Sequence, residues 1–226
     1  MKPNLPMLLS VNGGYVDTAG FLALHGLFTT HVTGNFVTLG AALVLGTSGA
    51  VAKLLALPVF CVVVMGVRLI SVALMSSRFR GLRPILGLKL MLLFLGSGLA
   101  IGLGPFESGD GWAAVLTGMT LVSAMAIQNA IHRIHMTALP PTTIMTGNTT
   151  QVMIDLADLM RGMPTDTRNA IHARLSRMSG SLAAFALGCA AAALMYAKQG
   201  IWCFALPPIV GACTLLFREP VPPKNP

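Results

Sequence analysis

Long apolar runs with few charges decide what this chain can fold into. The runs cover residues 54–75, 86–103, 112–131, 182–197 and 201–217. An α-helix needs roughly 20 apolar residues, at about 1.5 Å each, to cross about 30 Å of hydrocarbon. Charged residues make up 10% of the chain, against about 25% in soluble domains. Barrel strands would alternate polar and apolar residues, and these runs do not. The sequence therefore predicts an all-α, polytopic membrane protein.

A polar string occurs twice in this apolar chain. Residues 29–35 read Thr-Thr-His-Val-Thr-Gly-Asn and residues 142–148 read Thr-Thr-Ile-Met-Thr-Gly-Asn, so five of seven positions match at one offset (142 − 29 = 113). We call them the first string and the second string. Internal repeats indicate duplicated units, and in membrane transporters they often mark the substrate site. We therefore expect two membrane repeats, 1–105 and 106–226, within one integral membrane domain.

Basic residues predict the orientation of the spans, because Lys and Arg gather on cytoplasmic loops. One basic stretch follows the predicted helix 54–76, and a second covers residues 161–177. The first stretch consists of Arg78, Arg80, Arg83 and Lys89. Both stretches are predicted to be cytoplasmic, as is Arg133 at the end of the run 112–131. Residues 148–160 then start and end on the same side, so they cannot form a full span.

This orientation predicts about six spans, two short helices, and both termini in the cytoplasm. Three spans per half is an odd number, so the two repeats should be inverted relative to each other. Eight spans in two parallel halves is the alternative, and it would place one basic stretch outside. The spans cover about 8–27, 54–76, 85–104, 112–132, 178–197 and 200–217, and the short helices about 35–45 and 148–160.

The two short helices are expected to be either re-entrant or interfacial. In the second of them, Asp155, Asp158 and Arg161 recur every three residues with Gln151 one turn earlier, which predicts a polar stripe on an amphipathic helix. Asp158 and Arg161 are spaced to form an ion pair on the helix surface.

Rows of small residues at every fourth position predict close packing of helices in lipid. Three rows are present: Gly98 and Gly102; Gly96, Ala100 and Gly104; Gly180, Ala184 and Gly188.

The strings suggest either helix caps or a binding element. A Thr or Asn at the start of a helix can cap its free N–H groups, and glycine relaxes the backbone there. If those N–H groups also face a cavity, they favour an anion. The candidate substrate-binding residues in the strings are Thr30, Thr33, Gly34, Asn35, Thr143, Thr146, Gly147 and Asn148.

Asp17 is an isolated carboxylate near the middle of the first predicted span. Such a group is costly in a membrane and indicates a functional site, unless the helix break at Gly13 and Gly14 leaves it solvated. With one gap, Asp17 corresponds to Asn129 in the second repeat, and Gln128 with Asn129 forms an amide pair there. We add Asp17, Gln128 and Asn129 to the substrate-binding candidates. Arg68 could pair with Asp17, contact an anionic substrate, or extend to the headgroups.

Several function classes are excluded or disfavoured. The net charge of +8 fits the positive-inside rule, so nucleic acid is not an expected partner. No catalytic signature such as a phosphate-binding glycine loop or His-Glu-x-x-His occurs, so an enzyme, a cofactor and a metal site are not expected. His132 and His135 could share a helix face, but two histidines make a weak metal signal, and we expect them at the surface.

Four segments resemble the YoaK-like family of bacterial inner-membrane proteins, a domain of unknown function. They are Gly-Tyr-Val-Asp-Thr-Ala-Gly-Phe at 14–21, the residues 28–35, Ala-Ile-Gln-Asn-Ala at 126–130, and the residues 142–148. Where the family pattern shows Met-Gly before Gln-Asn, this chain has Ala126 and Ile127, so the second site lacks a glycine. The resemblance implies about six helices and a bacterial inner (plasma) membrane location, and it supplies no substrate.

The function these features favour is a small secondary transporter or permease for a small polar or anionic solute, proton-coupled through Asp17. Because six spans are few for a monomeric carrier, we expect a homodimer in the lipid bilayer. The alternatives are a passive channel or facilitator, and a non-transporting assembly or sensor subunit.

Overall fold

The computed structural model describes residues 4–74, 82–162 and 164–217. Within these ranges the chain forms α-helices and one 3₁₀ helix and no strand, which confirms the all-helical fold. Arg78, Arg80 and the end of the predicted span 54–76 lie outside the described residues. The elements are α1 (Leu5–Ala23), α2 (Gly34–Leu45), α3 (Ala50–Leu74), α4 (Arg83–Leu103), α5 (Trp112–His135), α6 (Met145–Met160), α7 (Thr165–Gln199), η1 (Gly200–Ala205) and α8 (Leu206–Leu215).

Four segments are long and apolar enough to cross a membrane, which supports the predicted membrane class. They are Ala50–Ala73, Arg83–Leu103, Trp112–His135 and the continuous stretch Thr167–Leu215, which contains the predicted span 178–197 and most of the predicted span 200–217. α1 is not among them, although a span was predicted at 8–27. Asn12 and Asp17 lower its hydropathy, and both side chains are buried inside the protein.

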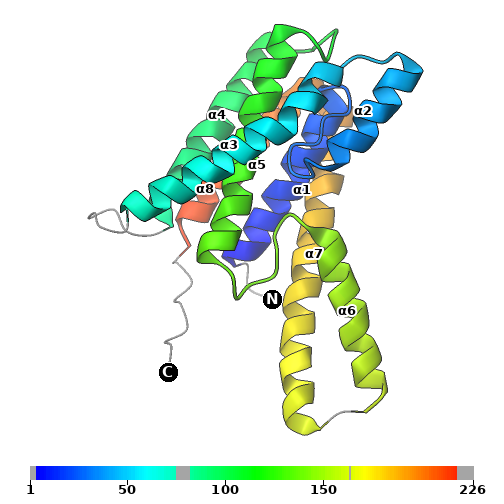
Figure 1. The fold of residues 1–226 in the computed structure, drawn as a ribbon, viewed down its shortest axis with the longest axis vertical. Coiled ribbons are helices and arrows are strands. Elements are labelled where there is room, and N and C mark those ends of the chain that lie inside the picture. The colour runs from blue at the N-terminus through cyan, green and yellow to red at the C-terminus, as the bar shows by residue number, and fades with distance from the viewer. Residues whose placement is uncertain (1–3, 75–81, 163, 218–226) are drawn as a thin grey trace.

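The central helices are α1 and α5, and they run in opposite directions (Figure 1). α1 packs along α7 and against α8, whereas α5 packs along α3 and α4. The short helices α2 and α6 lie on α3 and α7 respectively. Exchanging α1 with α5, α2 with α6, α3 with α7 and α4 with α8 maps each of these pairings onto another. The first helix of each half therefore packs mainly against the last two α-helices of the other half: α1 against α7 and α8, and α5 against α3 and α4.

Two glycines let α1 and α7 touch through their backbones. A β-carbon on Gly14 of α1 would overlap the Phe185 carbonyl oxygen, and one on Gly188 of α7 would overlap the Val11 carbonyl oxygen. Small residues at such crossings allow close helix packing in lipid, so the row that ends at Gly188 packs as predicted. The row of Gly98 and Gly102 does not, because open space surrounds both positions.

We expect Gly188→Ala to destabilise the protein, whereas Gly98→Ala, its matched control on α4, should be neutral or slightly stabilising. Glycine costs a helix roughly 0.5–1 kcal/mol relative to alanine, so the control gains helix propensity without a clash. At Gly188 the added carbon forces α1 and α7 apart, which costs about 1–3 kcal/mol. Thermal unfolding of the two variants in one detergent measures the difference. Equal melting temperatures would contradict the crossing described here.

The helices α6 and α7 form a hairpin that extends beyond the rest of the bundle (Figure 1). The expected Asp158–Arg161 pair is replaced by a contact between helices. Arg174 of α7 donates from Nε and Nη2 to the buried Asp155 carboxylate, at 2.8 and 2.5 Å, and Gln151 donates to the same carboxylate at 2.7 Å. These hydrogen bonds hold the pKa of Asp155 below its usual value, and those from Arg174 contribute most to the shift. The basic stretch before the predicted span 178–197 is thus helical, and it is the partner of α6.

Candidate functional site

The first string is held by Asp17, whose side chain is buried in α1. Its Oδ1 atom accepts hydrogen bonds from the backbone N–H groups of Thr29 and Thr30, at 2.9 and 2.7 Å, and a longer one of 3.4 Å from the Thr29 hydroxyl. Asp17 lies well before the end of α1 at Ala23. The connection to α2 therefore turns back along α1 instead of leaving the bundle.

His31 completes this arrangement, and sequence reasoning did not select it. Its Nδ1 atom lies 2.6 Å from Asp17 Oδ2, and its side chain is 40% exposed whereas that of Asp17 is 6% exposed. The ring edge also contacts Phe185 of α7. The hydrogen bond to Asp17 raises the pKa of His31. A buried carboxylate thus has an accessible imidazole beside it. The signal that could have found it was the place of His31 in the middle of the first string.

The second string is held by the amide pair at the corresponding place on α5. Asn129 Oδ1 accepts a hydrogen bond of 2.7 Å from the Thr143 hydroxyl, and Gln128 Nε2 donates to the Thr142 hydroxyl at 3.2 Å. Thr30 and Thr143 occupy the same position in their strings. Asp17 and Asn129 therefore contact equivalent residues, in line with the correspondence expected from their spacing.

An asparagine closes each string onto its own beginning. Asn35 Nδ2 donates to the Phe28 carbonyl oxygen at 2.8 Å, and Asn148 Nδ2 donates to the Pro141 carbonyl oxygen at 2.9 Å. Both partners stand seven residues earlier in the chain. The Phe28 N–H also donates to Asn35 Oδ1 at 2.8 Å, a bond that Pro141 cannot make because proline has no N–H. The two strings thus share one local hydrogen bond at the offset found in the sequence.

The expectation that a Thr or Asn side chain caps each short helix was wrong. Thr33 precedes α2 without a side-chain cap bond, and α6 starts after Ile144, again without one. Thr33, Thr146 and Gly147 are exposed. Neither Gly34 nor Gly147 has a positive φ; Gly34 instead lies against the Phe28 ring, which its β-carbon would approach to 3.1 Å. The asparagine, and not the threonine, fixes the turn of each string.

The two strings come together at Gly13 of α1. The Thr30 hydroxyl of the first string donates to the Gly13 carbonyl oxygen at 3.4 Å. A β-carbon on Gly13 would lie 3.3 Å from the Thr142 carbonyl oxygen and 3.6 Å from Thr143 Cγ2, both in the second string. The same β-carbon would lie 3.2 Å from Gln128 Nε2. Polar segments 113 residues apart thus both lie next to one glycine.

Lys89 supports this polar centre from α4, inside the predicted span 85–104, and counting it also with the basic link before that span was wrong. Its side chain is 1% exposed, and Nζ donates to Gln128 Oε1 at 2.6 Å. Gln128 Nε2 in turn donates to the Leu9 carbonyl oxygen at 2.8 Å. The apolar residues on both sides of Lys89 in the sequence were the signal that it lies within a span. We call Asp17, His31, Gly13, Gln128 and Lys89 the central cluster, together with the string residues bonded to them.

Arg68 does not reach Asp17, whose partner is His31. It lines a pocket of about 350 Å³ between α3 and α5, which also contains Asn129 and Arg133. Of the predicted site residues, the structure thus brings Arg68 near Asn129 and leaves it away from the first string.

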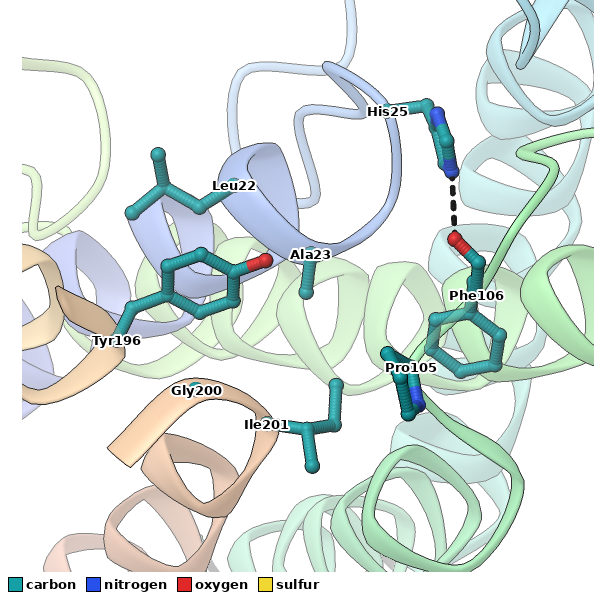
Figure 2. A pocket seen from close by; sticks show the side chains of 8 residues that line it. All are labelled: Leu22, Ala23, His25, Pro105, Phe106, Tyr196, Gly200 and Ile201. Carbon is teal, nitrogen blue, oxygen red and sulfur yellow. Dashed lines mark hydrogen bonds between the residues drawn. The ribbon is translucent and has the colours of Figure 1, made fainter. Parts of the chain in front are cut away.

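A second pocket of about 330 Å³ lies near the start of α5, where the ends of α1, α4 and α7 meet. Figure 2 shows the Tyr196 hydroxyl directed toward Ala23, and His25 beside Phe106. His25 Nε2 lies 2.9 Å from the Phe106 carbonyl oxygen, which joins the α1–α2 and α4–α5 connections. Because Arg133 lies near the other end of α5, the two pockets belong to opposite ends of the bundle.

Metal ligands do not gather in the part of the chain that the structure describes: no group of three or more His, Cys, Asp or Glu side chains could hold an ion there. The expected surface position of His132 was wrong. Its side chain is buried, and its Nδ1 atom has no hydrogen-bond partner, because α5 continues to His135 and packs His132 inside.

Comparison with known proteins gives a family and no named relative. No curated protein and no solved structure matches the chain. The model of a family described as "Protein of unknown function (DUF1275)" matches residues 5–217, which include both strings and the central cluster. The chain therefore belongs to the DUF1275 family.

Proposed function

We propose that this protein is a small secondary transporter for a small polar or anionic solute. The observation that carries the proposal is the convergence of both strings on Gly13, inside an otherwise apolar bundle. Polar, non-helical backbone at membrane depth is tolerated where it is buried in protein or lines a wet cavity. The two pockets at opposite ends of the bundle support a path that the central cluster interrupts.

The transporter would consist of two inverted repeats, 1–105 and 106–226. The opposite directions of α1 and α5 and the exchangeable helix pairings favour this arrangement. The shared asparagine bond in the two strings also favours it. In transporters built this way, the substrate site lies at the interface of the repeats, beside interrupted helices. We assign that role to the two strings, with α2 and α6 as the short helices that follow them.

Asp17 would carry the coupling proton, and His31 would exchange it with the aqueous side. As a carboxylate, Asp17 holds the first string by accepting its backbone N–H groups. A proton on Asp17 weakens those bonds because a neutral carboxyl is a poorer acceptor than a charged one. The first string could then leave α1 and open the path, so proton binding and solute access would be linked.

Proteoliposomes with an internal pH-sensitive dye test this function. Small anions and polar solutes are added one at a time outside vesicles that contain the wild-type protein. A transported solute should acidify the interior through co-transport, and an imposed proton gradient should accelerate its uptake. Solute flux that does not depend on the proton gradient would favour a passive facilitator. If no solute moves, and Thr33–Asn35 variants alter only the proteins that co-purify, the transport proposal is wrong.

The proposed orientation places both termini and the α6–α7 turn in the cytoplasm of a bacterial inner membrane. A cysteine in place of Thr165, at the exposed start of α7, should react with an impermeant maleimide only in inverted vesicles. The variant is made after the four native cysteines are replaced, because Cys61 is exposed. Labelling of intact cells would place this turn outside and refute the six-span orientation.

We also propose a homodimer. α2 exposes Phe36, Val37, Leu43, Val44 and Leu45, an apolar face that lipid or a second copy can cover. Native mass measurement in mild detergent should give twice the chain mass, and an active monomer would refute the dimer.

A further inference from the structure

The pocket between α3 and α5 is apolar at one end and basic at the other, and neither string contributes this pattern. Its lining comes from two helix faces and from Ile144 at the start of α6. On α3, the lining residues Phe60, Val64 and Arg68 follow one another at every fourth position, so they form a single stripe. The stripe changes from apolar to basic toward the C-terminal end of α3. We call this hollow the α3–α5 pocket.

The facing stripe on α5 changes in the same direction. Asn129 and Ala130 are followed one turn later by Arg133 and Ile134. Because α3 and α5 point the same way (Figure 1), Arg68 and Arg133 both lie toward the same end of the bundle. The apolar part of the α3–α5 pocket therefore lies nearer the middle of the candidate span α3, and the two guanidinium groups lie nearer the C-terminal ends of α3 and α5.

The two arginines are not neutralised by the residues that the structure describes. The carboxylates in ion pairs there are Asp17, with His31, and Asp155, with Arg174. No hydrogen bond or ion pair joins the side chain of Arg68 or Arg133 to another described residue, and both residues are exposed. Two unpaired guanidiniums that share one pocket attract a group with planar or tetrahedral oxygens, such as phosphate, to which arginine can donate two parallel hydrogen bonds.

We propose that the α3–α5 pocket binds an anionic phospholipid. Its phosphate lies between Arg68 and Arg133, and one acyl chain lies against Phe60 and Val64. The order of chemistry along the pocket, apolar inside and basic outside, matches the order of a lipid in its leaflet. A free hydrated anion would gain nothing from the apolar lining and would lose water to enter it. The lipid proposal does not rest on the transport proposal, but it concerns the same pocket: a bound lipid would occupy one end of the proposed path, next to Asn129 and the second string.

Native mass spectrometry of the detergent-purified full chain tests the site. Phosphatidylglycerol and phosphatidylcholine with identical acyl chains are titrated separately, and bound lipid is counted. Phosphatidylglycerol should bind at concentrations about tenfold lower, because phosphatidylcholine has the same phosphate but adds a quaternary ammonium that the two guanidiniums repel. Arg68→Gln and Arg133→Gln should each reduce its binding about tenfold, whereas Arg161→Gln, an exposed arginine outside the pocket, should leave it unchanged.

A pocket-filling variant separates binding from loose adsorption. Val64→Trp keeps both guanidiniums and fills the apolar part, so it should also abolish phosphatidylglycerol binding. Equal binding of the two lipids, or wild-type binding by the Arg68→Gln, Arg133→Gln double variant, would overturn the proposal. Displacement of the lipid by millimolar inorganic phosphate would overturn it in favour of a free-anion site. Unchanged binding in a folded Val64→Trp variant would show that the apolar part of the pocket does not hold an acyl chain, which would also overturn the proposal.

Discussion

Asp17→Asn should abolish gradient-driven solute uptake while the protein still folds and inserts. Asparagine has nearly the same shape, and its carbonyl oxygen can still accept the N–H groups of Thr29 and Thr30, which Asp17 binds at 2.9 and 2.7 Å. It stays neutral, so it holds the first string as weakly as a protonated Asp17 would, and opening of the path no longer depends on a proton. Neutral acceptors bind less strongly than charged ones, and we expect about 1–2 kcal/mol of lost stability.

The measurement compares two fluxes in proteoliposomes. Uptake driven by a proton gradient should fall to the rate of empty vesicles, whereas exchange of labelled for unlabelled solute without a gradient should persist. Asp158→Asn is the control, since it removes a carboxylate from α6 that takes no part in the central cluster. Gradient-driven uptake at the wild-type rate in Asp17→Asn would remove Asp17 from the coupling mechanism, whatever the solute.

Gln128→Leu should cause the largest loss of stability of any single change in the central cluster. The amide links three elements: it accepts from Lys89 of α4 at 2.6 Å and donates to Leu9 of α1 and Thr142 of the second string. Leucine fills a similar volume but leaves the fully buried amine of Lys89 without its acceptor. Leaving a buried polar group without a hydrogen-bond partner costs about 1–3 kcal/mol.

A second substitution isolates the cause of that loss. In the Lys89→Met, Gln128→Leu double variant no buried amine remains without an acceptor, so we expect most of the stability to return. Chemical unfolding of the two single variants and the double variant in one detergent gives the coupling free energy between the side chains. A double variant as unstable as the sum of the singles would mean that Lys89 and Gln128 act independently.

The candidate site could be predicted from the sequence at positions where a polar residue interrupts an apolar run. Asp17 and the Gln128–Asn129 pair stood out as polar groups in apolar runs, and the structure buries Asp17 and Gln128 and partly buries Asn129. The repeated strings gave the offset at which Asn35 and Asn148 make the same bond. Whether these residues bind a solute remains a prediction that the flux measurements address.

Other assignments failed because charge was counted without its surroundings. The charge rule counts Lys89, which lies in the predicted span 85–104, with the cytoplasmic link before it, and it treats the basic start of α7 as a connection. In the structure, Lys89 finds an acceptor on α5, and Arg174 finds Asp155 on α6. A charge rule describes loops on average; it cannot identify a basic residue that has a partner on another helix.

The sequence by itself determined the helical membrane class, the extent of most helices and the existence of a repeated polar element, because hydropathy, span length and repetition are properties of the chain alone. Only the tertiary structure decided that His31 pairs with Asp17, that Lys89 is internal, and that both strings meet at Gly13. These contacts join residues brought together by helix packing, and Gly14 and Gly188 set how closely α1 and α7 approach. The spacing of residues along the chain does not specify how closely α1 and α7 approach each other.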